Sequence, residues 1–249
     1  MFVSASTECF AELSLQEALD RLADLEYSSV EVDLHEEGRH VRPSFIAQDL
    51  DKAVHDVRDT HRLNVVSYSV KITATGEEHY KHWAACCRLA KTTKVVSLTV
   101  PSAELGTPFN EEVEHLRKLV GIASVDGLLV SIRNQVGRLS QDLDTVTVLC
   151  DNVKGLGLTF DPSHFLAVPQ RNKSYDIILK YIYNVHLRDS KKDQIHVRVG
   201  QGEIDYSKII TCLRKLKYHR ALTVHMGELP DTDHNGEMRK IRLLLESLL

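Results

Sequence analysis

Long apolar runs, blocks of one charge sign and regularly spaced cysteines are all missing from this 249-residue sequence. No apolar stretch reaches the roughly 20 residues that cross a bilayer, and the opening MFVSASTE lacks the basic and apolar parts of a signal peptide. The formal charge is -4, and without a basic block nothing draws the chain to nucleic acid or to an anionic membrane. We therefore expect a cytoplasmic protein with no nucleic-acid or membrane partner.

The five cysteines stand at irregular positions, two of them are adjacent, and no C-x-x-C pair occurs. This pattern fits neither a disulfide framework nor a zinc site built on cysteine, and it indicates reduced thiols. A G-x-G-x-x-G turn after the first strand-like run is also missing, which argues against a doubly wound sheet that binds a dinucleotide.

Eight short runs rich in Val, Leu, Ile, Thr and Ser recur along the whole chain. Several are apolar at nearly every position, which is typical of buried parallel strands. The predicted strands cover residues 2–5, 29–34, 65–70, 95–100, 128–132, 156–160, 184–187 and 221–224.

An amphipathic, helix-like segment follows each run. The first opens with the capping box Ser14-Leu-Gln-Glu17, and further helices are predicted over residues 45–61, 79–90, 111–123, 142–150, 175–183, 206–216 and 236–249. Strand and helix alternating eight times, with no linker rich in Pro or Gly, predict an α/β fold. We expect one (β/α)8 TIM barrel domain over residues 1–249, with the doubly wound sheet as the alternative.

Polar residues of the metal-ligand and acid–base types follow the later strands. Asp161 and His164 stand in DPSH, His186 and Asp189 in HLRD, and His225 follows the last run. Because functional residues of a barrel lie at the carboxyl ends of its strands, these side chains should converge. Carboxylates and imidazoles bind divalent metals. Taken singly, each residue could equally be a turn former, a helix cap or a structural histidine.

A segment with paired glycines, Gly200 and Gly202, follows the seventh run. It allows close backbone approach to a ligand, or it is a plain loop in which Asp205 caps the next helix. The ends of the earlier strands carry less specific residues, Glu8, His35, Lys71 and Ser102. We expect His35, His79 and His82 to be surface or loop residues.

Three motifs in this order, LGLTFDPSHF, VHLRDS followed by VRVGQGEIDY, and RALTVHMGELPD, resemble the xylose-isomerase-like barrels. That family includes sugar phosphate isomerases and epimerases, with endonuclease IV as a relative, and the resemblance covers essentially the whole chain. It implies a manganese or zinc ion held by Glu, Asp, His and Glu from strands five to eight, with the glutamates moving a proton between adjacent carbons of a keto sugar. Matched by motif, Asp161 and His186 are metal ligands, and His164 and Arg198 contact the substrate.

The departures from the family pattern fall on both glutamates. Arg133 precedes Asn134 where the family has Glu-Asn, and His225 stands where strand eight supplies the second Glu. A guanidinium about 5 Å from a dication is repelled by roughly 7 kcal/mol at an effective dielectric of 20. We therefore expect a weak or absent metal, with His225 as the remaining third ligand if one is bound, and a bidentate contact between Arg133 and Asp161. Arg133 and Asn134 are predicted to contact the substrate.

Two functions stay open. The first is an isomerase or epimerase for a small keto sugar, sugar phosphate or polyol, with His225 or His164 as the general base. The second is a non-catalytic barrel that binds a sugar-like ligand or a partner protein. The endonuclease relative is disfavoured, because strands three and four do not end in the histidines that it needs. A homo-oligomer is compatible with the sequence.

Overall fold

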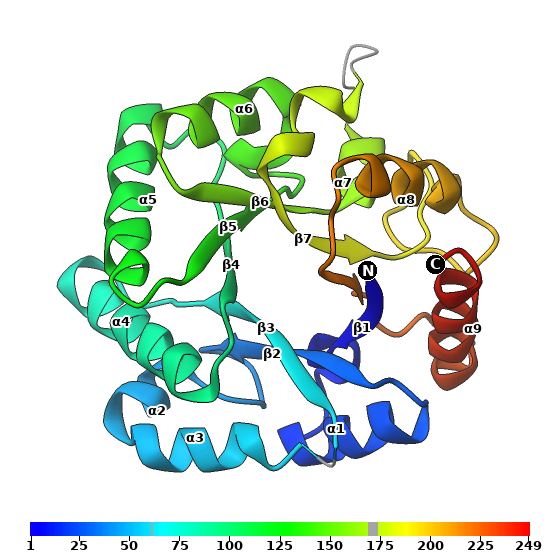
Figure 1. Cartoon of the computed structure of the whole chain (residues 1–249), viewed down its shortest axis with the longest axis horizontal. Helices are drawn as coiled ribbons and strands as arrows, with labels where there is room; N and C mark the ends of the chain where they lie inside the picture. Colours follow the sequence, from blue (N-terminus) through cyan, green and yellow to red (C-terminus); the bar gives the residue numbers. More distant parts are fainter. Residues whose placement is uncertain (61, 169–173) are drawn as a thin grey trace.

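Eight parallel strands close on themselves in sequence order, and β1 pairs with β8 to complete the barrel. The computed structural model describes residues 1–60, 62–168 and 174–249. The strands are β1 (Phe2–Ser6), β2 (Ser29–His35), β3 (Asn64–Lys71), β4 (Ser97–Pro101), β5 (Leu129–Arg133), β6 (Leu156–Phe160), β7 (Ile182–Leu187) and β8 (Ala221–Val224). The predicted TIM barrel is confirmed, and Figure 1 shows its strands inside a ring of helices.

The described helices pack around the outside of the strands (Figure 1). They are α1 (Leu15–Asp24), α2 (Pro43–Gln48), α3 (Leu50–Arg58), α4 (Gly76–Thr93), α5 (Phe109–Ser124), α6 (Leu143–Asn152), α7 (Pro162–Ala167), α8 (Tyr206–Lys215) and α9 (His234–Ser247), with 3-10 turns η1 (Thr7–Phe10), η2 (Leu139–Gln141), η3 (Tyr175–Ile177) and η4 (Leu179–Tyr181). The predicted capping box at the start of α1 is present. None of the helices in the described part of the chain is long and apolar enough to cross a membrane.

Two predicted helices differ from the structure. The segment 45–61 divides at Asp49, whose side chain accepts the Lys52 N–H and begins α3; its predicted last residue, His61, lies outside the described residues. The helix predicted over 175–183 is wrong. The turns η3 and η4 lie there instead, and the last two predicted residues, from Ile182 on, belong to β7, where Ile182 pairs with Leu158. The helix between β6 and β7 is instead α7, which Asp161 caps.

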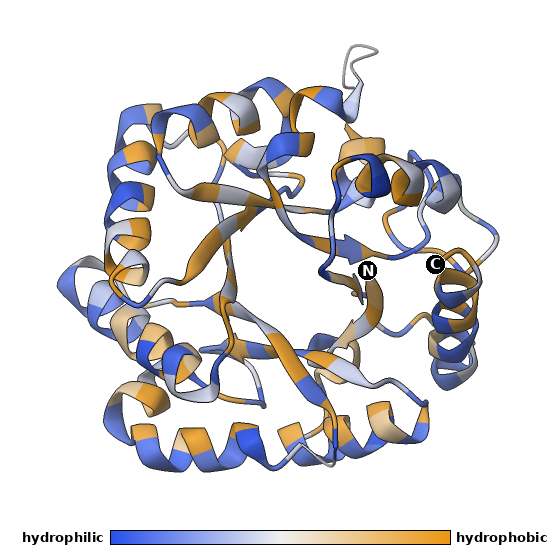
Figure 2. Ribbon diagram, viewed as in Figure 1, coloured by the Kyte–Doolittle hydropathy of each residue, from blue (hydrophilic) through white to orange (hydrophobic). Residues whose placement is uncertain are grey.

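Polar side chains fill the inside of the barrel, and apolar side chains of the same strands face the helices. Contacts between strands that are not neighbours identify the inner face: Thr99 Oγ1 on β4 lies 2.7 Å from Thr159 Oγ1 on β6, and Asn184 on β7 donates to Glu31 on β2 at 2.8 Å. Since side chains alternate along a strand, every second residue from these points inward. Figure 2 shows the resulting mixture of hydrophilic and hydrophobic residues on the strands.

Candidate functional site

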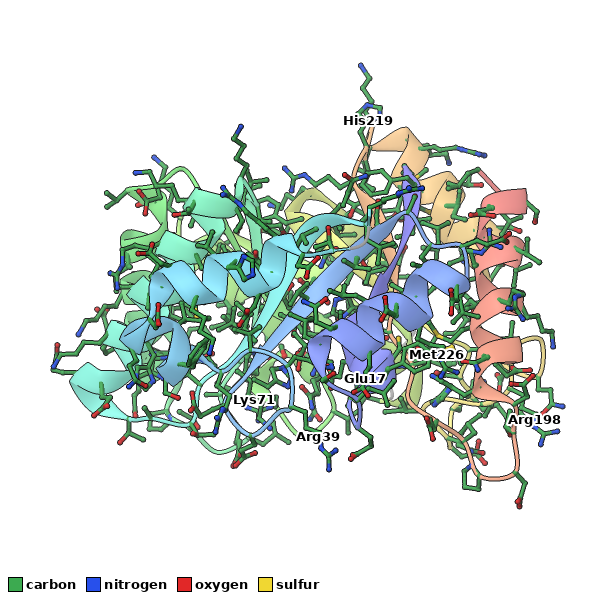
Figure 3. All side chains as sticks on the ribbon, turned by 90° about the horizontal axis from the view of Figure 1, so that it is seen from below. Glu17, Arg39, Lys71, Arg198, His219 and Met226 are labelled. Atoms are coloured by element: carbon green, nitrogen blue, oxygen red, sulfur yellow. The ribbon has the colours of Figure 1, made fainter. Side chains whose placement is uncertain are left out.

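Because inward-facing residues alternate along each strand, charged residues lie at the carboxyl-terminal ends of the strands, which form the mouth of the barrel. Figure 3 places His219, which precedes β8, at the top, and Lys71 at the end of β3 and Met226 after β8 toward the bottom, so the strands end at the lower face in that view. The next inward residue after Ser131, Thr159 and Thr223 is, in turn, Arg133, Asp161 and His225. These three positions meet at the mouth, as expected for strand ends of one barrel.

A buried ion pair occupies the centre of this mouth. Asp161 is 0% exposed, and its Oδ2 accepts from Nη2 of Arg188, which is 9% exposed. The other carboxylate oxygen, Oδ1, accepts the Ser163 N–H and so caps α7 at 3.0 Å. Burial opposes ionisation of Asp161, but the Arg188 guanidinium holds the pKa of that carboxyl well below its usual range. The expectation that Arg133 pairs with Asp161 was wrong: Arg188, the first residue after β7, does so.

Arg133 turns toward the opposite side of the mouth. Its Nη1 lies 3.0 Å from Nε2 of His225 and 4.0 Å from Oε2 of Glu8, and Nη2 donates to Gln135. The neighbouring Asn134 is fully buried, and its amide bridges the backbone N–H and C=O of Asp161 at 2.8 and 2.7 Å. Asn134 was predicted to contact substrate. In the structure both ends of its amide position Asp161.

His225 contacts one carboxylate and two guanidinium groups. Its Nε2 is 2.8 Å from Oε2 of Glu8 and 3.0 Å from Nη1 of Arg133, and these two partners are themselves 4.0 Å apart. Its Nδ1 lies 3.4 Å from Nη1 of Arg188. The Nε2 nitrogen can donate a proton to Glu8 or accept one from Arg133, but not both at once. Burial lowers the pKa of His225, so the ring is neutral near pH 7. Burial opposes ionisation of Glu8, but His225 and Arg133 hold its pKa well below the usual range.

His186 lies one layer deeper and is 0% exposed. Its ring stacks on that of His225, with centroids 4.6 Å apart and planes inclined by 13°. Its Nε2 lies 2.8 Å from Oε1 of Glu31 on β2, across the barrel. Burial opposes ionisation of Glu31, but His186 beside it lowers the pKa of this carboxyl to about 2. The predicted metal ligand His186 thus faces a buried carboxylate that sequence analysis did not single out.

His164 in α7 borders the ion pair. Its Nε2 lies 3.7 Å from Oδ2 of Asp161 and 3.0 Å from Nη2 of Arg188, and Nδ1 accepts the Val136 N–H at 3.3 Å. Burial, followed by the charge of Arg188, lowers the pKa of His164 to about 4, although Asp161 opposes this. The imidazole is therefore neutral at pH 7.

The glycine-containing loop after β7 is organised by Asp189. Its Oδ2 accepts the N–H groups of Gly200 and Gly202 at 2.7 and 3.0 Å, and Asp205 caps α8. The plain-loop interpretation therefore accounts for both glycines. Arg198 of this loop is exposed and donates to Asp231 O and Thr232 Oγ1 at the rim (Figure 3).

A cavity of about 200 Å³ opens above the strand ends from β1 to β5. Three cationic side chains, Lys71, Arg133 and Arg138, and one carboxylate, Glu8, line it.

His35 also lines this cavity, on the inner face of β2, and is not a surface or loop residue as expected. His82 is likewise buried, on α4. The alternation in β2 was the signal that could have placed His35 inside.

The eight-stranded closed barrel with polar residues at the carboxyl ends of its strands is a TIM barrel. The model of the family described as xylose isomerase-like TIM barrel matches residues 19–244. This chain belongs to that family. No curated protein matches the sequence.

Solved structures similar over the full length include a xylose isomerase domain protein from Planctomyces limnophilus (15% identity, TM-score 0.76, 99% of this chain and 96% of the other). Others are 3-keto-D-glucoside 4-epimerase from E. coli in its apo form (14%, 0.76, 99% and 99%) and a xylose isomerase-like TIM barrel protein from Mycobacterium smegmatis in complex with magnesium (14%, 0.77, 99% and 97%). At these identities the likeness shows the fold alone.

Proposed function

We propose that this protein binds a small sugar, sugar phosphate or polyol in the cavity at the barrel mouth, without a divalent metal at the family position. The contact between Arg188 and Asp161 carries the proposal, because it places a fixed positive charge on the carboxylate that would hold the ion. The ligand contacts that we propose are Arg133, His164 and, at the rim, Arg198. The cationic lining of the cavity suits a ligand with a phosphate or carboxylate group.

The residues at the family metal position do not fit a dication. Asp161 is the one carboxylate among the four positions, and Arg188 already neutralises it. His225 contacts Glu8 at 2.8 Å, and His186 is left beside a carboxylate, Asp161, that Arg188 already neutralises. A second guanidinium, from Arg133, borders the site, and each guanidinium would repel a dication by about 7 kcal/mol at roughly 5 Å and an effective dielectric of 20. No step of the proposed chemistry therefore uses an ion here.

The pair formed by His225 and Glu8 supports an isomerase or epimerase activity. A neutral, buried imidazole beside an ionised carboxylate can accept a proton from a carbon next to a carbonyl and return it to the neighbouring carbon on the same face, while the hydroxyl proton passes between the two adjacent oxygens. Arg133, 3.0 Å from Nε2 of His225, can stabilise the negative charge that forms on the carbonyl oxygen. This pair would take over the role of the two missing glutamates.

A non-catalytic barrel is the second candidate. It is favoured by the replacement of both family glutamates, by Arg133 and His225, and by the full engagement of Asp161 in an ion pair. The two candidates share the binding site and differ in whether a proton leaves the ligand.

Binding and proton exchange are measured separately. Calorimetric titration with keto sugars, sugar phosphates and polyols should find a ligand whose affinity falls about 10- to 100-fold in Arg133→Gln, since charged hydrogen bonds contribute roughly 1.5–3 kcal/mol. The matched control is Arg88→Gln, an exposed position on α4, which should bind like the wild type.

Deuterium exchange at the carbon beside the carbonyl, followed by NMR, should occur in the wild type and stop in His225→Gln. Binding without exchange selects the non-catalytic candidate, and no binding by any compound contradicts the proposal.

A further inference from the structure

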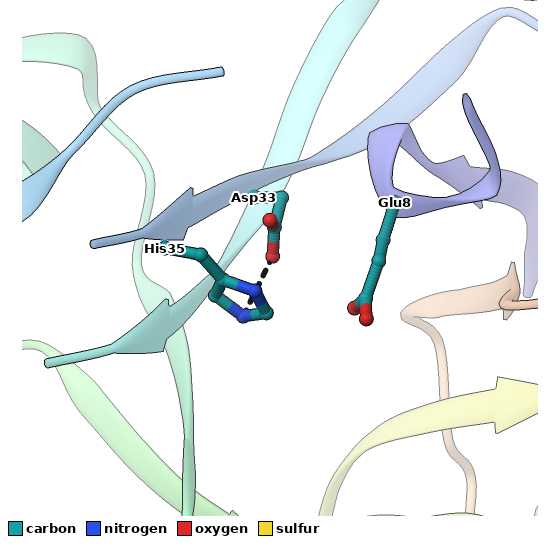
Figure 4. Close-up of side chains that lie close together, drawn as sticks. All are labelled: Glu8, Asp33 and His35. Atoms are coloured by element: carbon teal, nitrogen blue, oxygen red, sulfur yellow. Dashed lines mark ion pairs between the residues drawn. The ribbon is translucent and has the colours of Figure 1, made fainter. Parts of the chain in front are cut away.

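A second group of ligand-type side chains lies across the barrel mouth from Asp161. Asp33 and His35 are two residues apart on β2, so both face inward, and Glu8 follows β1 in η1. One ligand atom from each residue lies within 4.8 Å of the other two. Among residues 1–60, 62–168 and 174–249, this is the group of three His, Cys, Asp or Glu side chains that lie close enough to share a metal ion. Figure 4 shows the two carboxylates and the imidazole turned toward the same space.

The Asp33 carboxylate is the part of this group that most needs a partner. Asp33 is 3% exposed. Its Oδ1 lies 2.8 Å from Nε2 of His35 without the alignment of a hydrogen bond, and nothing else in the described part of the chain donates to it. Burial raises the pKa of Asp33 to about 6, although His35 opposes this. A buried carboxylate oxygen without a donor is costly, and a bound cation removes that cost.

The geometry points to a divalent-cation site formed by Glu8, Asp33 and His35, none of which is one of the four family metal-ligand positions. Two carboxylate oxygens and one imidazole nitrogen suit a borderline ion such as Zn²⁺, which takes these ligands at about 2.0–2.2 Å. Two ligand atoms on one such ion lie at most about 4.3 Å apart, roughly twice the bond length. The side chain of Glu8 is 30% exposed, so it has room for the small rotation that brings all three atoms into this range.

Charge favours this side of the mouth over the family position. Glu8 and Asp33 present two carboxylates, and the group in direct contact with Glu8, His225 at 2.8 Å, is a neutral imidazole that leaves the carboxylate charge in place. Asp161, in contrast, is in direct contact with the Arg188 guanidinium, which neutralises it. The nearest guanidinium, Arg133, has its Nη1 4.0 Å from Oε2 of Glu8. It approaches from the side of His225, and two carboxylates in direct contact with the ion outweigh one guanidinium beyond them.

Three protein ligands leave a coordination position open. Glu8 and His35 line the cavity of about 200 Å³, so an ion between them would face it. A hydroxyl, carboxylate or phosphate oxygen of a small ligand could complete the coordination, as substrate or water does in catalytic zinc sites. Lys71 and Arg133 on the same cavity would balance the negative charge of such a ligand.

Zinc titration of matched variants tests this site. The full-length protein, freed of metal with a chelator and then dialysed, is titrated calorimetrically with Zn²⁺, and Co²⁺ absorption reports the ligand set. We compare Asp33→Asn with Asp161→Asn, and His35→Gln with His164→Gln. The wild type should bind one ion. Asp33→Asn and His35→Gln should each lose more than about 100-fold in affinity, since even residues that only orient metal ligands change affinity by roughly 10- to 100-fold.

Asp161→Asn and His164→Gln should bind zinc like the wild type. Should circular dichroism show that Asp33→Asn does not fold, His35→Gln decides alone, because His35 is partly exposed. Absence of binding in the wild type, equal binding in all variants, or loss confined to Asp161→Asn would each overturn the proposal. None of these results depends on a sugar ligand being found, so the site and the proposed function fail or succeed separately.

Discussion

At the scale of single residues, buried charges dominate the barrel mouth. Asp161 is fully buried and its charge is balanced by Arg188. Removing one partner of a buried pair leaves the other charge without compensation, at a cost of about 3–5 kcal/mol. The partner that remains after Arg188 is removed is a carboxylate with 0% exposure, so this site should show the effect clearly.

We expect Arg188→Met to lower the free energy of unfolding by about 3–5 kcal/mol. Combining it with Asp161→Asn removes the uncompensated charge, so the double variant should be more stable than Arg188→Met alone. Urea denaturation of both variants and of the wild type measures this. Arg88→Met on the exposed face of α4 is the control and should change stability by less than about 0.5 kcal/mol. A double variant less stable than Arg188→Met would show that the ion pair is not what holds Asp161.

Glu112 on α5 makes the protein's stability depend on pH. It is 2% exposed, and burial raises its pKa from 4.5 to about 7, although it accepts the Ala103 N–H. Between these pH values the folded state holds the proton and the unfolded state has released it, so stability falls as pH rises through this window.

We expect Glu112→Gln, which keeps an acceptor for Ala103, to remove this fall. The wild type should lose on the order of 2 kcal/mol more than the variant between pH 5 and pH 8, at about 1.4 kcal/mol per pKa unit. Urea unfolding of both proteins at the two pH values gives the comparison. Parallel pH profiles would mean that Glu112 titrates normally in the folded protein.

At the scale of elements, the loop from β7 to α8 depends on a residue without a side chain. A Cβ atom at Gly202 would lie 1.9 Å from Oδ1 of Asp189 and 2.7 Å from the backbone nitrogen of Ser190. Asp189 holds the loop through the N–H groups of Gly200 and Gly202. Gly202 is therefore needed for close packing against this carboxylate.

We expect Gly202→Ala to lower the unfolding free energy by about 1–3 kcal/mol, the usual cost of overpacking. Gly121 on α5 offers a matched control, because a Cβ there meets no atom within 4 Å. Gly121→Ala should stabilise by up to about 1 kcal/mol through helix propensity. Thermal unfolding of both variants gives the comparison, and equal midpoints would contradict the role of Gly202.

At the scale of the whole molecule, closure joins the two ends of the chain. Four residue pairs connect β1 to β8, from Phe2 with Ala221 to Ala5 with Val224. A closed barrel has no free sheet edge at which one half could separate. We expect one cooperative unfolding transition for residues 1–249, followed in parallel by circular dichroism and Trp83 fluorescence. Limited proteolysis that released two stable fragments of about 100 residues would contradict a single domain.

The sequence by itself was sufficient to predict the barrel fold and to identify residues at the strand ends that form its mouth. Strand alternation and helix amphipathicity are local patterns, so they predicted the eight strands and placed Asp161 and His225 correctly at strand ends. The helix predicted over 175–183 failed at its C-terminal end because Ile182 pairs with Leu158 in the sheet, and such tertiary pairing overrides a local helical pattern.

Only the tertiary structure decided which charges meet. Arg188, not Arg133, reaches Asp161, and Glu8 meets His225 from 217 residues away in the chain. His35 joins Asp33 and Glu8 because β2 lies next to β1 and turns its inner face to the mouth. The electrostatic energy of such pairs depends on distances of a few ångströms across the barrel. Local periodicity carries no information about those distances, and closure of the sheet sets them.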